Sequence, residues 1–157
     1  MRITLALVGK TDQEFFVQAI EEYRKRITRY CKFEIKTISE PRNTKSMPVE
    51  VQLQKEAEAI VPLTQGVAEV ILLDEHGQEF NSVDFASFVE KRINTGQRDI
   101  LFVIGGPYGF AEKVKKMDHT RISLSRLTFS HQLVRVIFME QLFRAFTIIK
   151  GEPYHHP

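Results

Sequence analysis

Short runs of apolar residues alternate along this chain with longer segments in which apolar residues recur every three or four positions. The short runs lie at residues 3–8, 33–38, 70–73 and 101–104, and a further short strand-like piece lies at residues 121–123. The longer segments lie at residues 15–30, 49–61, 82–93, 111–117 and 132–147. A short run is typical of a strand and the longer spacing of an amphipathic helix. Their alternation predicts an α/β fold with a doubly wound, mostly parallel sheet covered by helices on both faces.

Local signals predict where several of these elements begin and end. Residues 11–14, Thr-Asp-Gln-Glu, have the form of a capping box, which starts a helix. Asn81 or Ser82 can cap the helix that follows, and Gly96 can end it. Residues 74–77 are interpreted as a turn that ends the strand at 70–73, and the polar residues 41–48 as a mobile loop.

The segment at residues 132–147 is apolar on nearly every side, which is typical of a buried helix. A chain this short can cover only part of such a helix, so we expect a second copy of the chain to cover the rest. Phe138 and Phe143 lie five positions apart, so we expect one to face the core and the other the partner. His131 is interpreted as a residue that caps and orients this helix.

Composition fits one domain over residues 1–157, with 43% apolar and 27% charged residues. The sequence shows neither an apolar run of membrane-spanning length nor a signal pattern at its start. The only cysteine, Cys31, cannot form an internal disulfide, which fits a reducing compartment. None of the five histidines is spaced from another ligand as metal sites require. We therefore expect a cytoplasmic protein with no membrane segment and no metal.

The basic residues are unevenly distributed although the net charge is only +2. Residues 21–45 carry eight Lys or Arg against four acids. Such clustering permits contact with a phosphate backbone, but a solvated helix face has the same pattern. Charge alone therefore leaves nucleic-acid binding open.

The residues that could bind a ligand lie in two loops, each directly after a predicted strand. Residues 101–104 lead into Gly105-Gly106-Pro107-Tyr108-Gly109, and residues 121–123 lead into Leu124-Ser125-Arg126-Leu127-Thr128-Phe129. Ligands of open α/β sheets bind beyond the carboxyl ends of the strands. Three glycines in five residues favour close approach of the backbone to a ligand. We expect these two strands to be neighbours and their loops to form a binding site.

Two familiar nucleotide-binding motifs do not fit. Gly9-Lys10-Thr11 is not the end of a P-loop, because Thr4 stands where that motif requires glycine. The glycines at 105–109 have the wrong offsets for a dinucleotide fingerprint. A nicotinamide-dependent oxidoreductase is thereby disfavoured. A non-catalytic RNA-binding module remains an alternative, although it would not require the two loops together.

At residues 104–109, 124–129 and 131–136, and at the terminal Tyr154-His155-His156, the chain resembles a known family. This is the ribosomal RNA large subunit methyltransferase H family, of the SPOUT class of S-adenosylmethionine-dependent methyltransferases. The resemblance covers the whole chain. One departure is Ser130, where the family often has proline before the His-Gln pair.

The resemblance implies a C-terminal trefoil knot, a homodimer with the last helix in its interface, and S-adenosyl-L-methionine bound as methyl donor in the knot. The implied reaction is N3-methylation of a pseudouridine in the 23S ribosomal RNA of the assembled ribosome. Catalytic roles are implied for Tyr154, His155 and Arg144. The implied cofactor-binding residues are Leu73, Gly105, Leu124, Ser125, Arg126, Leu127, Thr128 and Phe129. A Gly105→Val change should then block the cofactor while sparing the fold.

Overall fold

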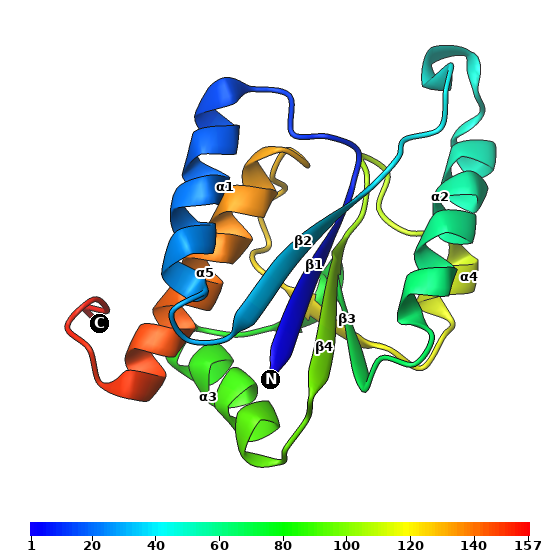
Figure 1. Cartoon of the computed structure of the whole chain (residues 1–157). Helices are drawn as coiled ribbons and strands as arrows, with labels where there is room; N and C mark the ends of the chain where they lie inside the picture. The colour runs from blue at the N-terminus through cyan, green and yellow to red at the C-terminus, as the bar shows by residue number, and fades with distance from the viewer.

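The computed structural model describes every residue from 1 to 157 and contains one sheet of five strands (Figure 1). The strands are β1 (Arg2–Val8), β2 (Lys32–Ile38), β3 (Glu69–Glu79), β4 (Asp99–Ile104) and β5 (Thr120–Ser123). Their order across the sheet is β2-β1-β4-β3-β5, and every pairing is parallel. The prediction of a parallel, doubly wound sheet is therefore confirmed.

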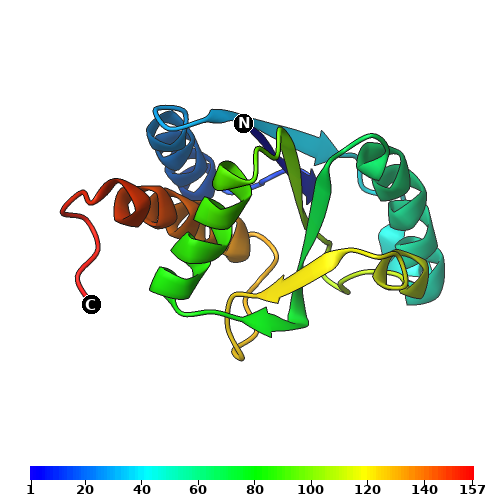
Figure 2. The same cartoon turned by 90° about the horizontal axis from the view of Figure 1, so that it is seen from below.

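Helices cover both faces of this sheet (Figure 2). One face carries α1 (Glu14–Ile27), α3 (Ser82–Asn94) and α5 (Leu133–Lys150), and the other carries α2 (Val49–Thr64) and the short α4 (Glu112–Lys115). Along β4, Phe102 and Ile104 belong to the buried cluster under α1, α3 and α5, whereas Leu101 and Val103 belong to the cluster on the other face. Burial on both faces explains why the strands read as unbroken apolar runs. No helix has both the length and the apolar character needed to span a bilayer.

Both ends of α1 differ from the prediction, whereas the N-terminal cap of α3 agrees with it. The capping box does not form: Gln13 is the N-cap of α1, and its side chain makes no capping hydrogen bond. The helix ends at Ile27, and Tyr30 beyond it stacks on Phe146 of α5 with ring centroids 5.2 Å apart. At α3 the predicted cap is confirmed, because Asn81 Oδ1 accepts a hydrogen bond from the Asp84 N–H at 2.8 Å.

The predicted turn at residues 74–77 is wrong, because β3 runs through it to Glu79. The strand pairs with Ile122 of β5 twice, first at Leu73 and again at Gln78, so the four residues between them form a bulge. The two strands that carry the candidate loops are not neighbours either. β3 lies between β4 and β5, so the binding region spans three strands.

The chain leaves β5 at one edge of the sheet and returns to the end of β1 before α5 begins. Gln132 accepts a hydrogen bond from the Asp12 N–H at 3.1 Å and donates one to the Lys10 carbonyl at 3.0 Å. Arg135, which is fully buried, donates to the Val8 carbonyl at 2.6 Å and to Thr11 Oγ1 at 2.9 Å. These bonds join segments about 120 residues apart in sequence. The trefoil knot implied by the resemblance stays a prediction.

Two predictions about α5 need correction. His131 does not cap the helix; the Ser130 hydroxyl does, by accepting a hydrogen bond from the Leu133 N–H at 3.1 Å. Phe138 and Phe143 do not face different surroundings, because both are buried within the single chain, at 0% and 8% exposure. They pack in the same cluster, so neither is free to meet a partner.

Replacing Arg135 with alanine is expected to lower the free energy of unfolding by about 3 kcal/mol, because the buried Val8 carbonyl loses its side-chain donor and a cavity opens. Denaturant unfolding followed by circular dichroism measures this change. The control is Arg29→Ala, an exposed arginine in the turn after α1, for which we expect a change within about 0.5 kcal/mol. Equal effects of the two variants would show that the Arg135 hydrogen bonds do not stabilise the fold.

Candidate functional site

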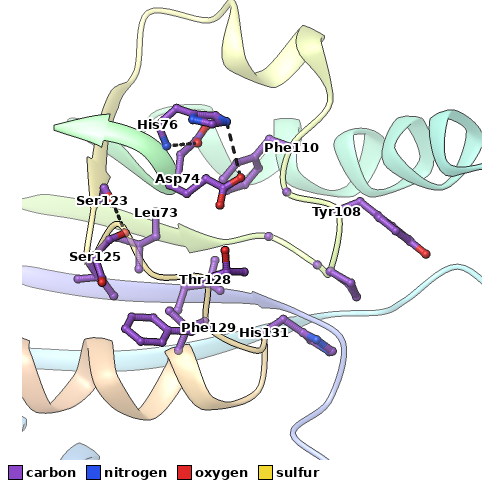
Figure 3. Close-up of a pocket in the computed structure, with 18 of the residues that line it drawn as sticks. Leu73, Asp74, His76, Tyr108, Phe110, Ser123, Ser125, Thr128, Phe129 and His131 are labelled. Atoms are coloured by element: carbon purple, nitrogen blue, oxygen red, sulfur yellow. Dashed lines mark hydrogen bonds and ion pairs between the residues drawn. The ribbon is translucent and has the colours of Figure 1, made fainter. Parts of the chain in front are cut away.

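A cavity of about 390 Å³ opens where β4 and β5 end and where β3 leaves the ladder of β5 (Figure 3). All the predicted cofactor-binding residues except Arg126 line it. The lining comprises residues 73–76, 104–110, 122–125 and 127–129, with Lys115, His131 and Val134. The structure thus brings the ends of β4 and β5, the middle of β3 and the start of α5 together around one space.

Arg126 is the predicted cofactor-binding residue that lies apart from the cavity. Its side chain is 88% exposed, and its Nε donates to Glu79 Oε1 at 3.1 Å. The adjacent Leu127 does line the cavity although it is 74% exposed.

The glycine loop after β4 is a tight turn that leaves little space for side chains. Gly109 donates its N–H to the Gly106 carbonyl at 3.1 Å and has a φ of +76°. A Cβ on Gly105 would lie 2.7 Å from the Gly109 carbonyl oxygen. A larger residue at position 105 would therefore clash with the backbone of its own loop before it reached a ligand. A valine at Gly105 thus requires a local shift of this loop, and the expectation that it blocks the cofactor while sparing the fold stays a prediction.

Serine hydroxyls hold the backbone of the second loop. Ser123 Oγ donates to the Ser125 carbonyl at 3.0 Å, and Ser125 Oγ accepts from the Leu127 N–H at 2.9 Å. Such short-range bonds fix an otherwise irregular segment. These two hydrogen bonds therefore restrain the loop that closes this side of the cavity.

His131 lines the cavity at the start of α5 (Figure 3). Burial, with the nearby charge of Arg135, lowers the pKa of His131, so its ring is neutral at pH 7. Sequence reasoning assigned it to the helix cap and missed its place in the cavity wall.

Asp74 was also missed, because residues 74–77 were interpreted as a turn. It follows Leu73 directly, lines the cavity and has a side chain only 6% exposed. The available signal was an acid at the very end of a wholly apolar run, residues 70–73.

In the described chain no group of three His, Cys, Asp or Glu side chains could hold a metal ion.

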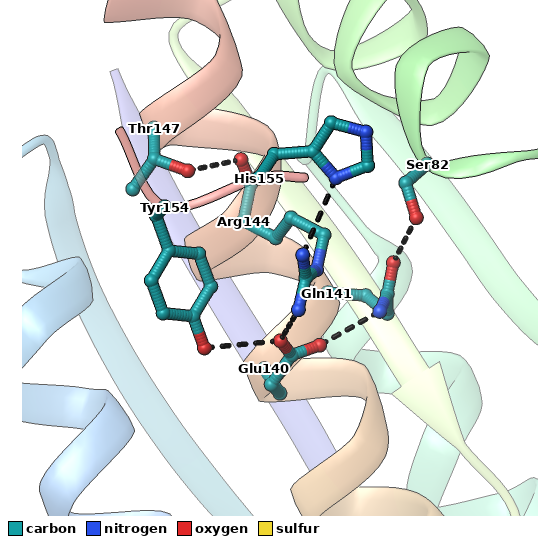
Figure 4. A network of polar contacts seen from close by, with 7 residues as sticks. All are labelled: Ser82, Glu140, Gln141, Arg144, Thr147, Tyr154 and His155. Carbon is teal, nitrogen blue, oxygen red and sulfur yellow. Dashed lines mark hydrogen bonds and ion pairs between the residues drawn. The ribbon is translucent and has the colours of Figure 1, made fainter. Parts of the chain in front are cut away.

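The three predicted catalytic residues lie together in a second place, on α5 and the tail (Figure 4). Glu140 is the centre of this network. Its Oε1 accepts hydrogen bonds from Arg144 and, at 3.1 Å, from the Tyr154 hydroxyl. The Arg144 guanidinium also lies 3.3 Å from Nδ1 of His155. The tail is held in place further by Tyr154, whose ring packs edge-on against Phe143.

This network does not reach the cavity of the same chain. Arg144 is ten residues along α5 from Val134 in the cavity wall, which corresponds to about 15 Å at the rise of an α-helix. None of Arg144, Tyr154 and His155 lines the cavity. One chain therefore carries both candidate clusters but holds them apart.

Sequence comparison finds relatives that match nearly the whole chain. A family model described as "Predicted SPOUT methyltransferase" matches residues 1–155. A protein of Parabacteroides distasonis named ribosomal RNA large subunit methyltransferase H is 47% identical over 156 residues, with 99% of both chains covered. A protein of the same name from Christiangramia forsetii is 48% identical over the same length and coverage.

Solved structures with the same arrangement are more distant. The tRNA (m1G37) methyltransferase from Aquifex aeolicus superposes with a TM-score of 0.56 at 16% identity, over 100% of this chain and 75% of that one. A probable methyltransferase from Bordetella pertussis Tohama I superposes with a TM-score of 0.54 at 9% identity, over 92% of both chains. At these identities the likeness shows a shared fold.

Proposed function

This chain belongs to the ribosomal RNA large subunit methyltransferase H family of SPOUT methyltransferases, and we propose that it methylates N3 of a pseudouridine in 23S ribosomal RNA. The proposed methyl donor is S-adenosyl-L-methionine, and the proposed substrate is the assembled ribosome in the cytoplasm. The observation that carries the proposal is the single cavity that gathers Leu73, Gly105 and the loop at residues 124–129.

The cavity fits an adenosyl cofactor in size and chemistry. Its volume of about 390 Å³ lies within the range of small-molecule sites, about 300–1,000 Å³. Leu73, Ile104, Phe129 and Val134 supply apolar walls for a purine. When bound there, S-adenosylmethionine supplies an electrophilic methyl group on a positively charged sulfur.

The chain's own residues then have to orient the nucleobase and manage its proton. Burial, followed by the neighbouring Tyr23 and Glu140, raises the pKa of Tyr154 to about 12, so its phenol stays protonated at neutral pH. Tyr154 can position a base but cannot accept the N3 proton. We propose that this proton passes to His155 or to water, and that Arg144, which donates a hydrogen bond to Glu140, contacts a carbonyl or phosphate of the substrate.

A second copy of the chain would bring the two clusters together. Leu133 is 38% exposed on α5, and Ile137, one turn further along, is half-buried and packs in neither buried cluster. We propose that a homodimer covers this strip of α5 and places the tail of one protomer at the cavity of its partner. The roughly 15 Å between the clusters within one chain supports this arrangement.

Ile137→Glu is expected to give folded monomers, because an unpaired charge in an apolar contact costs several kcal/mol. Sedimentation velocity at micromolar concentration measures the assembly state. Phe138→Glu, one residue further along α5, is the matched control. Phe138 is fully buried in the chain, so this variant is expected to unfold instead. A wild-type protein that sediments as a monomer would contradict the dimer.

The proposed function is tested by mapping methylation on ribosomal RNA from cells that lack this protein, with re-expression as the control. Purified protein should bind S-adenosylmethionine in calorimetry and should methylate whole ribosomes. A net charge of only +2 gives weak electrostatic affinity for free RNA, so a short stem-loop should be a poor substrate. Absence of cofactor binding would favour the non-catalytic RNA-binding alternative. Equal methylation of stem-loop and ribosome would contradict the assembled substrate.

A further inference from the structure

The bulge of β3 places the Asp74 side chain, which is only 6% exposed, in the cavity wall. Between Leu73 and Gln78 the strand leaves the ladder of β5, and residues 74–76 of this segment line the cavity. Gly77 allows this path, since a Cβ there would lie 2.6 Å from the backbone of Arg121 and Ile122. Within the bulge, the His76 N–H donates to Asp74 Oδ1 at 2.9 Å (Figure 3). This bond fixes the orientation of the Asp74 carboxylate.

The second oxygen of Asp74 has no hydrogen-bond donor. Oδ2 is buried, and the nearest cation, Arg121 Nη1, lies 3.8 Å away, which is too long for a hydrogen bond. Buried polar atoms in folded proteins nearly always have a partner, because an unsatisfied one costs about 1–3 kcal/mol. The neighbouring side chains of Glu75 and His76 are 61% and 74% exposed and lie against each other. Asp74 Oδ2 is therefore the buried oxygen of the bulge that lacks a hydrogen-bond donor.

We infer that Asp74 accepts a hydrogen bond from a ribose hydroxyl of the adenosyl cofactor. We choose a hydroxyl over a cation because the Arg121 guanidinium, 3.8 Å from Oδ2, already places one positive charge beside the carboxylate. A neutral donor then gains a charge-assisted bond without adding a second positive charge. An acidic side chain also binds the ribose 2′-hydroxyl in dinucleotide folds, by the same chemistry. This inference rests on the proposed function, which supplies the adenosyl ligand.

The proposed hydrogen bond is tested by calorimetry on the full chain. The affinities of S-adenosylhomocysteine and of its 2′-deoxy and 3′-deoxy counterparts are compared. Wild-type protein is expected to bind one deoxy ligand about tenfold more weakly than the parent, equivalent to about 1.4 kcal/mol. Asp74→Ala should bind the parent about tenfold more weakly and no longer distinguish it from that deoxy ligand. Glu90→Ala is the control, because it removes an exposed acid of α3 outside the cavity and should change neither value.

Asp74→Asn decides the question if the alanine variant does not fold. It keeps the side-chain size and an oxygen for the His76 N–H, and so places an amide nitrogen at the position of Oδ2. It should also lose most of the preference for the hydroxyl. Variants that discriminate between the parent and deoxy ligands as wild type does would overturn the inference and leave the function intact. Wild-type protein that binds none of these ligands would instead overturn the proposed function.

Discussion

Removal of residues 154–157 is expected to lower the turnover of ribosome methylation at least tenfold, about 1.4 kcal/mol of transition-state stabilisation. His155→Ala should reproduce part of that loss. In both variants S-adenosylmethionine affinity and dimerisation should stay close to wild type, because neither the lining of the cavity within each chain nor the strip of α5 at Leu133 and Ile137 contains a tail residue. Single-turnover methylation of ribosomes and calorimetry measure the two quantities. His155→Ala is the cleaner variant, since Tyr154 also packs on Phe143 and its removal costs stability.

His156→Ala is the matched control for the tail, because His156 is exposed and makes no hydrogen bond. It should methylate ribosomes at the wild-type rate. A His155→Ala protein with wild-type turnover would remove the tail from the reaction.

Mixing a tail variant with a cavity variant tests which cavity the tail serves. If the tail acts at the partner's cavity, equal amounts of protein lacking residues 154–157 and of Gly105→Ala protein should regain about a quarter of wild-type activity, since about half of the dimers would carry one complete site. If each chain acts within itself, mixing should restore nothing.

The strands and most helices could be predicted from the sequence because periodicity reports burial directly. The run at residues 101–104 is apolar throughout because β4 lies in the middle of the sheet with helices on both faces. The Asn81 cap was predictable because its hydrogen bond is to a residue three positions away. The two loops at the candidate site were found for the same reason: each directly follows a strand.

Features that depend on distant segments could not be predicted in this way. Residues 74–77 contain Asp, Glu, His and Gly, which favour a turn, yet pairing with β5 carries β3 through them as a bulge. The burial of Arg135 depends on carbonyl and hydroxyl partners about 125 residues earlier in the chain. The separation of Arg144, Tyr154 and His155 from the cavity depends on the path of α5. Periodicity alone does not report any of these.

Gly105→Ala is expected to abolish measurable S-adenosylmethionine binding in calorimetry. The added Cβ would lie 2.7 Å from the Gly109 carbonyl oxygen and 3.2 Å from its carbon, so the loop has to open. Opening would break the hydrogen bond from the Gly109 N–H to the Gly106 carbonyl and move the backbone that lines the cavity. Because the added Cβ is fixed to the backbone and meets backbone atoms of Gly109, no side-chain rotation can relieve these contacts.

Gly96→Ala separates this local effect from a general loss of stability. Gly96 follows α3 with a φ of +74°, and a Cβ there would meet no atom within 4 Å. The left-handed conformation should cost about 1 kcal/mol in the free energy of unfolding. Gly96 lies outside the cavity lining, so cofactor affinity should not change. A Gly105→Ala protein with wild-type circular dichroism and wild-type affinity would show that the glycine loop does not shape the cofactor site.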